Sequence, residues 1–232
     1  MKITKTKQES LNSQLFKIYA RSTAAVGKIE ELLDAGADID ALDVDGESIL
    51  IKMSNACNLA AVEFLMDRGA NLLIADKDGW TALHFAAHNG HKLVLECLLK
   101  NNPKEQLLLK DKLGGSALHL AASKGHTSAV EFLLNHNSTE QLLLKDKDVW
   151  TALNSAATLG RASVIEVFLK HLPIAQHIEI YHEALAIAKE MESYDCIAII
   201  EQSLLKHSLN EASPIDISQL ITSPLVKIRN RL

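Results

Sequence analysis

The chain has 232 residues, of which 47% are hydrophobic and 23% are charged, a composition that is typical of folded globular proteins and excludes a disordered chain. Its formal net charge of −5 argues against binding to a phosphate backbone, so we expect no nucleic-acid partner. Three widely spaced cysteines do not make a disulfide framework, and no apolar run approaches the roughly 20 residues that cross a bilayer. We therefore expect a cytoplasmic protein with no membrane span.

Internal repetition dominates the sequence. The octapeptide EQLLLKDK that begins at Glu105 recurs unchanged at Glu140, 35 residues later. Toward the N-terminus the spacing becomes 33 residues, because the D-x-D-G turn that ends at Gly79 has its counterpart at Gly46. Repetition at such a period predicts a solenoid of small stacked units.

The unit 76–110 shows the expected structure of one repeat. Thr81 is a suitable N-cap for a first helix, and Gly90 is a suitable residue to end it, because glycine readily adopts positive φ. The apolar residues of both helices recur at helical spacing; they are Leu83, Ala86 and Ala87, then Val94, Leu95, Leu98 and Leu99. A helix pair this small cannot bury its apolar face alone, so the units are expected to stack.

The run from Asp76 to His91, DKDGWTALHFAAHNGH, resembles the ankyrin repeat, whose pattern is D-x-x-G-x-T-P-L-H-x-A-A-x-x-G-H. The resemblance implies an all-α fold: an ankyrin-repeat solenoid of stacked helix-turn-helix units with finger turns, in about five to six repeats. It is clearest for the units that start at Asp43, Asp76, Asp111 and Asp146.

In chain order, we expect a solenoid over 1–207. It consists of an N-terminal capping unit at about 13–42, repeats at 43–75, 76–110, 111–145 and 146–177, and a degenerate C-terminal capping unit at 178–207, in which Leu185, Ala188, Ile197 and Ile200 keep the spacing. The tail 208–232 has two short apolar stripes, each preceded by a capping residue. Two interpretations stay open for it: short helices packed on the last unit, and a mobile tail.

Several residues depart from the family pattern. Val149 replaces the finger glycine, Asn154 replaces the histidine after the leucine, and Cys57 replaces the glycine between the two helices of its unit. The 35-residue units carry two extra residues in loops around 102–104 and 137–139. The usual proline of the pattern is replaced by Ala82, Ala117, Ala152 and Ile49, and we expect its loss to loosen the first helical turn slightly without changing the fold.

Histidines form the most suggestive chemical pattern. His84, His88 and His91 have the i, i+4 and i+7 spacing of a metal-ligand set, but Gly90 interrupts the helix between the last two. The resemblance implies instead that His84 and His91 are structural. With no nucleotide-binding or catalytic motif either, we predict a non-enzyme without metal, cofactor or catalytic residues. The alternative is an enzyme, or an accessory subunit, with its chemistry in 175–232; the candidate acid–base groups are Glu179, His182, Glu183, Glu190 and Glu192.

The resemblance implies a protein-binding scaffold that uses its finger tips and its concave face, and we expect a monomer with one protein partner. The candidate contact residues are Lys77, Asp78, Trp80, His88, Asn89, Lys112, Leu113, Gly115, Lys124, Lys147, Asp148 and Trp150. Trp80 and Trp150 share one finger position, with Gly115 between them. They are hypothesised to flank a notch that binds the partner, or else to fold onto the neighbouring finger.

Charge is unevenly distributed. Residues 29–51 hold eight acidic residues and no Lys or Arg, whereas 1–28 is basic. This is either a solvated face beside a basic arm or an electrostatic guide for a basic partner. The chain is short and rich in Lys, Asn, Ile and Leu, and in this respect it is similar to bacterial effector proteins with ankyrin repeats. This similarity implies, as an alternative to a cytoplasmic location, secretion into a host cell by a specialised bacterial secretion system, with a host protein as the partner.

Overall fold

The structure is a computed structural model that describes residues 4–18, 20–100, 103–136 and 139–211. These residues form an all-helical solenoid, which confirms the expected fold class. The helices are α1 (Lys5–Leu15), α2 (Ala25–Asp34), α3 (Ile49–Asn55), α4 (Leu59–Asp67), α5 (Ala82–His88), α6 (Lys92–Leu98), α7 (Pro103–Leu107), α8 (Ala117–Lys124), α9 (Thr127–His136), α10 (Thr139–Leu142), α11 (Ala152–Thr158), α12 (Ala162–His171), α13 (Ile174–Glu190) and α14 (Tyr194–Glu211).

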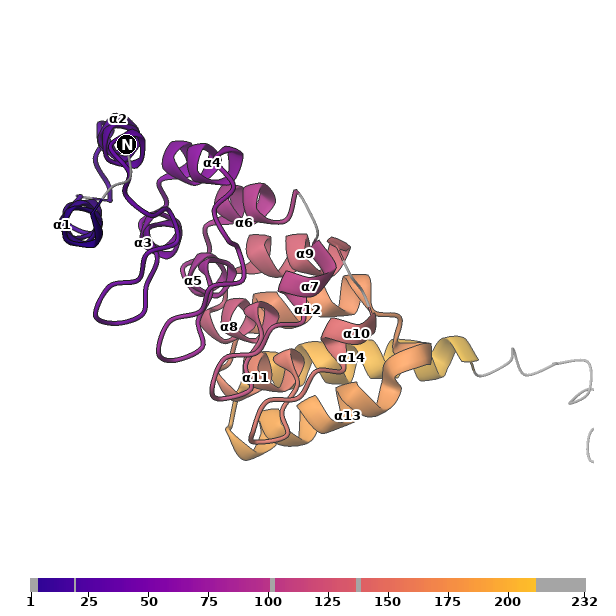
Figure 1. Cartoon of the computed structure of the whole chain (residues 1–232). Coiled ribbons are helices and arrows are strands. Elements are labelled where there is room, and N and C mark those ends of the chain that lie inside the picture. Colours follow the sequence, from indigo (N-terminus) through magenta and orange to yellow (C-terminus); the bar gives the residue numbers. More distant parts are fainter. Residues whose placement is uncertain (1–3, 19, 101–102, 137–138, 212–232) are drawn as a thin grey trace, which may run out of the picture.

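The units stack as two rows of helices. Figure 1 shows the first helices α3, α5, α8 and α11 side by side, with the second helices α4, α6, α9 and α12 in a parallel row above and to the right of them. The finger loops all project from the first row toward the same side (Figure 1). At the C-terminal end, α13 packs on α11 and α14 packs on α12, so the last two helices continue the stack.

Local sequence signals set the ends of the short helices. The side-chain oxygen of Thr81 accepts a hydrogen bond from the His84 N–H at the start of α5, and Ser48 and Thr151 cap α3 and α11 in the same way. Gly90 follows the end of α5 with a φ of 71°, a left-handed conformation that costs glycine little. The predicted start and end of this helix are therefore confirmed.

A single core runs the length of the stack. Leu83 and Ala86 of α5 and Leu98 of α6 have no exposed surface, and Leu99 is 2% exposed, so the predicted core is confirmed. The equivalent positions of the next unit are buried too, among them Leu118 and Leu133. Each helix pair thus buries its apolar face against its neighbours, as the repeat period implied.

Side chains at the Gly-His position tie neighbouring units together. His91 Nε2 donates to the Asn55 carbonyl at 3.1 Å, and His126 Nε2 donates to the His88 carbonyl at 2.9 Å. In the next unit, Arg161 Nε donates to the Ser123 carbonyl at 2.9 Å. Each side chain donates to a carbonyl near the end of the preceding unit's first helix, where the last carbonyl groups have no N–H donor within the helix.

The inserted loops form two short helices that the sequence analysis did not predict. These are α7 and α10, which lie between the second helix of one unit and the finger of the next. Gln106 Nε2 donates to the Leu98 carbonyl at 2.9 Å, and Leu107 and Leu142 are buried in the core. The repeated octapeptide therefore continues the core through the inserted residues.

Both ends of the solenoid differ in detail from the expected boundaries. Helix α1 begins at Lys5, upstream of the expected 13–42 unit, and α14 runs to Glu211, beyond residue 207. In the last unit Ala188 and Ile200 are buried as expected, whereas Leu185 and Ile197 are only partly buried. Tyr181 is the largest fully buried side chain there, and its hydroxyl donates to the Leu172 carbonyl at 3.0 Å. Residues 212–232 of the predicted tail lie outside the described residues.

Two buried histidines lead us to expect a stability that depends on pH. His84 and His119 occupy equivalent positions, and burial lowers the pKa of both imidazoles. Below about pH 6.5 the unfolded chain therefore binds protons that the folded chain does not, and the free energy of unfolding falls as the pH drops.

Urea melts at about pH 7.5 and about pH 5.5 measure this loss of stability. Because Asn154 fills the same position in the next unit, a His84→Asn/His119→Asn variant should lose less stability at low pH than the wild type does. An equal loss in both proteins would contradict the assignment.

Candidate functional site

Each finger is a turn organised by an aspartate at its start. The Asp76 carboxylate accepts hydrogen bonds from the backbone N–H groups of Asp78 and Trp80, both at 2.8 Å. Asp43, Asp111 and Asp146 make the same pair of bonds within their own fingers. The repeated aspartate thus gives successive fingers one shape.

Backbone hydrogen bonds join one finger to the next. The N–H groups of Lys77, Lys112 and Lys147 donate to the carbonyls of Asp45, Asp78 and Leu113, at 3.0, 2.9 and 2.9 Å. The contact is close enough that a Cβ atom on Gly79 would lie 2.9 Å from the Lys112 nitrogen. The fingers are therefore held in a fixed register, and equivalent side chains appear at regular intervals along one edge.

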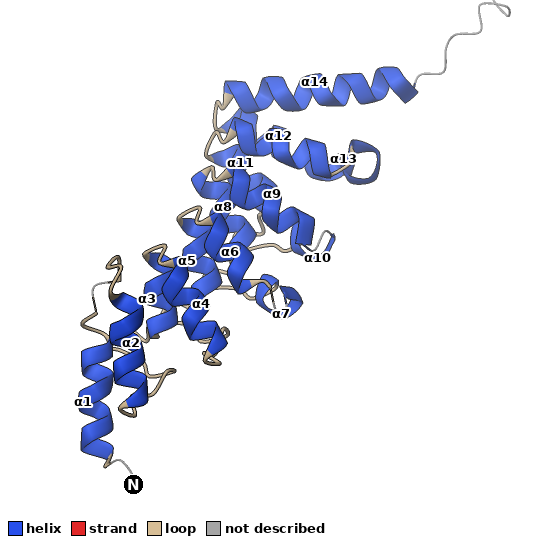
Figure 2. Cartoon of the chain, turned by 90° about the horizontal axis from the view of Figure 1, so that it is seen from above, coloured by secondary structure: helices blue, strands red, loops and turns tan. Residues whose placement is uncertain are grey.

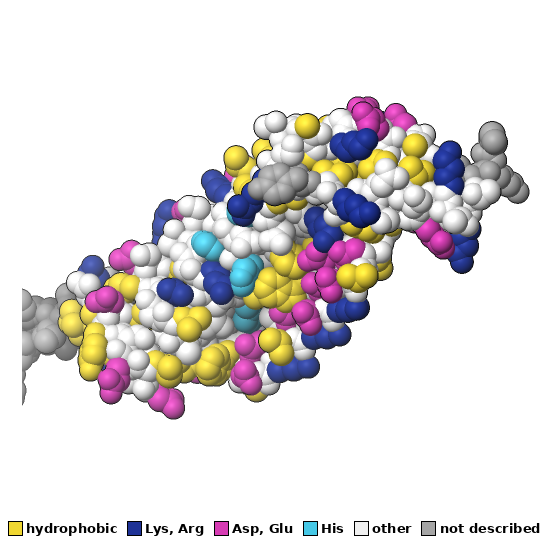
Figure 3. Space-filling view, turned by 90° about the vertical axis from the view of Figure 1, so that its left-hand side faces the viewer, with side chains coloured by type: hydrophobic (Ala, Val, Ile, Leu, Met, Phe, Trp, Pro, Cys, Tyr) yellow, Lys and Arg dark blue, Asp and Glu magenta, His cyan; other side chains and the backbone are white. Residues whose placement is uncertain are grey.

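Most of the expected contact residues are exposed or half-buried, and Gly115 is buried. The exposed ones are Lys77, Asp78, Lys112, Leu113, Lys124, Lys147 and Asp148, and the half-buried ones are Trp80, His88, Asn89 and Trp150. We call the exposed finger residues Lys77, Asp78, Lys112, Leu113, Lys147 and Asp148 the finger edge. Figure 3 shows basic and acidic side chains interleaved along one edge, and histidines beside a hydrophobic patch.

Gly115 is a correction to the expected set. It is buried, its N–H donates to the Asp111 carboxylate, and its carbonyl accepts from the Asp111 N–H. A partner cannot reach it as the floor of a notch between the two tryptophans.

Trp80 lies against the first helix of its own unit. Its ring centroid is 5.0 Å from that of Phe85, in an edge-to-face arrangement, and 4.9 Å from that of His88. This is neither the free notch wall nor the neighbouring-finger contact that the sequence suggested. Burial lowers the pKa of His88, the imidazole beside the tryptophan, and the charges of Lys124 and His126 lower it further.

Val149 is a strained residue in the last finger, which keeps the shape of the others. It has a φ of 66° where the preceding fingers have glycine, and β-branched residues are strained in this region. The Val149 side chain is largely exposed, so removing it sacrifices little buried apolar surface. Val149→Gly relieves the backbone strain and should therefore raise the free energy of unfolding by about 0.5–1 kcal/mol. Val44→Gly is the matched control, because Val44 is exposed and is not among the residues with positive φ. Thermal melts that showed the two variants equally destabilised would contradict the strain.

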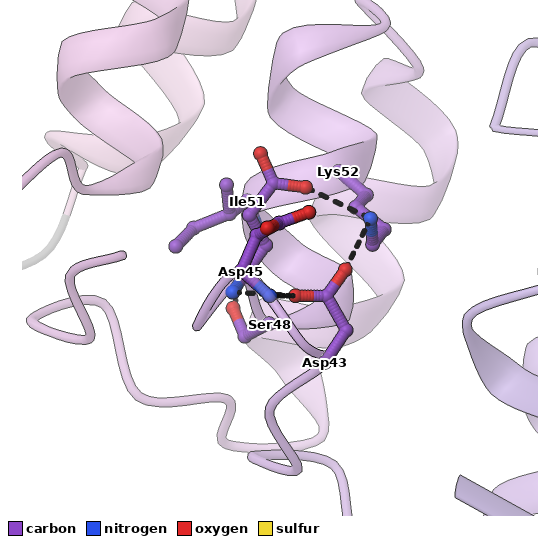
Figure 4. Close-up of polar contacts among 6 residues, drawn as sticks. Asp43, Asp45, Ser48, Ile51 and Lys52 are labelled. Carbon is purple, nitrogen blue, oxygen red and sulfur yellow. Dashed lines mark hydrogen bonds and ion pairs between the residues drawn. The ribbon is translucent and has the colours of Figure 1, made fainter. Parts of the chain in front are cut away.

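Cations from the adjoining segments neutralise much of the acidic stretch 29–51. Lys52 Nζ lies 2.6 Å from the Asp43 carboxylate and 2.8 Å from that of Glu47, and Figure 4 shows Lys52 and Asp43 joined in this way. Burial alone would raise the pKa of Asp43, but hydrogen bonds from Lys52 and from two backbone N–H groups outweigh it and lower the pKa. Arg68 bridges Glu30 and Asp34 at 3.4 and 3.1 Å. These ion pairs favour the interpretation of residues 29–51 as a solvated face with paired charges over the interpretation as an electrostatic guide for a basic partner.

Two clefts near α1 were missed by the sequence analysis. One of about 580 Å³ lies between α1 and the first finger, and its lining includes Asn12, Phe16 and Val44. The other, of about 540 Å³, lies between the end of α1 and α3 and is lined by residues that include Lys17 and Arg21. The short stretch of polar sequence in α1 carried no repeat motif that could have placed either cleft.

The groups proposed for catalysis in 175–232 do not share an enclosed site. Glu179, His182, Glu183, Glu190 and Glu192 are all exposed on α13 or just after it. Within the described residues, no three His, Cys, Asp or Glu side chains are placed to hold one metal ion. No helix of the described ranges is long and apolar enough to cross a membrane.

Comparison with known proteins gives matches to repeat proteins. A family model described as "Ankyrin repeats (3 copies)" matches residues 19–111 and 104–181, together more than half of the chain. The Notch-regulated ankyrin repeat-containing protein of Xenopus tropicalis is 28% identical over 71 residues, which are 31% of this chain and 62% of that protein. The chain thus spans less than two thirds of that relative.

Two bacterial relatives match over similar lengths. A putative ankyrin repeat protein of Rickettsia bellii is 35% identical over 82 residues, 34% of this chain and 45% of that protein. The phosphocholine transferase AnkX of Legionella pneumophila is 33% identical over 88 residues, which are 38% of this chain but 9% of AnkX.

Proposed function

The chain belongs to the ankyrin repeat family, whose repeats are generally protein-interaction domains, and from this premise we propose that it is a non-catalytic, monomeric scaffold that binds one partner protein. The proposed contact surface is the finger edge together with the adjoining concave face, which is formed by the exposed sides of α5, α8 and α11. The fixed register of the fingers is the observation that carries this proposal. A preformed surface lets a partner bind without first ordering the loops.

The chemistry of the finger edge indicates what the partner must present. Lys77 and Lys112 each lie beside an aspartate of the preceding finger, whereas Lys147 lies beside Leu113. Leu113 is 73% exposed at the tip of its finger, so burying it against a partner gains free energy at about 25 cal/mol per Å². A complementary partner carries an apolar side chain flanked by alternating charges.

The alternative of an enzyme has less support. All five candidate acid–base side chains of 175–232 are exposed, and general acid–base catalysis works best in a site that shifts pKa values and excludes water. AnkX is named as a transferase, but the match covers 9% of its length, so we infer no activity from that name.

A photo-crosslinking experiment tests the proposed surface. A photoreactive amino acid replaces Leu113 on the finger edge in one variant and Leu93 in a second, matched variant. Leu93 is 59% exposed but lies on α6, in the second row of helices. We expect a specific crosslinked partner from position 113 and none from position 93. Equal crosslinking from both positions would contradict binding through the fingers.

The biological setting is a further part of the proposal. Two of the relatives are bacterial, and we propose that the chain is an effector whose partner is a host protein. A reporter fusion that is active only in host cytosol, expressed in an intracellular bacterium, should give a signal that depends on the bacterium's secretion system. The absence of a signal from infected host cells, with the fusion protein present in the bacterium, would place the chain in the bacterial cytoplasm and contradict the effector role.

A further inference from the structure

The two ends of the solenoid differ in the polarity of their outer surfaces. At the N-terminal end, α1 is a polar helix that buries only Leu11 and Leu15, and its outer side is polar, as a capping helix requires. At the C-terminal end, α14 leaves Leu205 and Leu209 exposed, at 59% and 65%. These two leucines are four residues apart and therefore lie on one face of the helix. Figure 2 shows α14 at the end of the stack, opposite α1.

An apolar groove accompanies these leucines. It has a volume of about 450 Å³ and runs between α13 and α14. Its lining includes Ile178 and His182 from α13, and Glu201, Leu204, Leu205 and Ser208 from α14. The C-terminal cap therefore presents water with an open apolar groove where the family architecture needs a polar outer face.

The segment that follows α14 has the sequence to fill this groove. It starts immediately after Glu211, and Pro214 disfavours continuation of the helix, so the chain is expected to change direction there. Beyond it, Ile217, Leu220 and Ile221 have the i, i+3, i+4 spacing of one helical stripe. The length is suitable, because the stripe from Ile217 to Ile221 would span about 6 Å as a helix, the same rise as from Leu209 back to Leu205.

We propose that residues 215–222 return along α14 and bury Ile217, Leu220 and Ile221 in the groove between α13 and α14. Attachment through only a few residues gives this segment an effective concentration on the order of millimolar at the groove. A second copy of the chain would have to reach a similar concentration to compete. The covered groove then supplies the last layer of the solenoid.

Hydrogen exchange of the full chain tests the proposal. The variant Leu220→Asp/Ile221→Asp places charge on the apolar stripe, and Ser218→Asp/Thr222→Asp adds the same charge to the same segment off the stripe. We expect amides of residues 201–209 to exchange at least tenfold faster in the stripe variant and at the wild-type rate in the control. Reciprocally, Leu205→Asp/Leu209→Asp should speed exchange in 216–222 by a similar factor. Because both leucines are exposed on α14, this second variant is expected to stay folded.

Two results would overturn the proposal. The first is exchange of residues 216–222 in the wild type at the rate of an unstructured peptide. The second is protection of 201–209 that rises with protein concentration and survives the stripe substitutions, which would make a second copy the occupant. Light scattering on the same samples measures the mass directly, and the proposal requires a monomeric wild type.

Discussion

Replacing Leu133 with alanine should lower the free energy of unfolding by about 2–5 kcal/mol. Leu133 is fully buried on α9, a helix that packs against α6, α8 and α12. The cavity that the substitution leaves would therefore weaken contacts with the units on both sides. In a solenoid the loss of stability in one unit spreads to its nearest neighbours. Urea unfolding measures the change.

Leu93→Ala is the matched control for this prediction. Leu93 is also a leucine of a second helix, but it is 59% exposed, so its truncation should change stability by less than about 0.5 kcal/mol. Equal effects of the two substitutions would show that the repeats do not pack in the register described above.

Deleting residues 175–232 should lower the melting temperature strongly and cause association. The deletion removes Tyr181 and uncovers the apolar sides of α11 and α12, including Val164 and Phe168, both fully buried in the intact chain. Exposing each large apolar side chain costs about 1.5–3 kcal/mol. Thermal melts and light scattering measure the two effects.

The deletion also distinguishes the scaffold from the alternative enzyme. If 175–232 is a capping segment, the truncated chain is less stable and less soluble and no catalytic activity is lost with it. A truncated chain that is equally stable and monomeric would refute the capping role. Binding of a small molecule by the isolated 175–232 segment would support the alternative enzyme.

The repeat period explains why the fold could be predicted from the sequence. A spacing of 33 to 35 residues encodes long-range contacts directly, so the positions of Leu83, Leu98 and their equivalents sufficed to place the core. Features outside the helix-turn-helix pattern of the family were missed. Helices α7 and α10 come from insertions, and α1 offers only Leu11 and Leu15 as an apolar signal.

The candidate site was predictable in position but not in side-chain detail. The finger pattern located the exposed residues Lys77, Lys112 and Leu113. Two features were not visible in the sequence: the burial of Gly115, whose N–H donates to the Asp111 carboxylate, and the packing of Trp80 on α5. Ion pairs such as Arg68 with Asp34 join adjacent units, and only the structure defines which groups meet there.

The affinity of the crosslinked partner for two leucine variants tests the central claim most directly. Leu113→Asp changes the finger edge, and Leu93→Asp makes the same change at a comparably exposed position on α6. Binding through the fingers predicts that Leu113→Asp raises Kd about 30-fold or more, the effect of losing roughly 2 kcal/mol at a hot spot. Leu93→Asp should leave Kd unchanged, and both variants should melt at the wild-type temperature. An unchanged Kd for Leu113→Asp, or equal losses for both variants, would contradict the claim that this chain binds its partner through the finger edge.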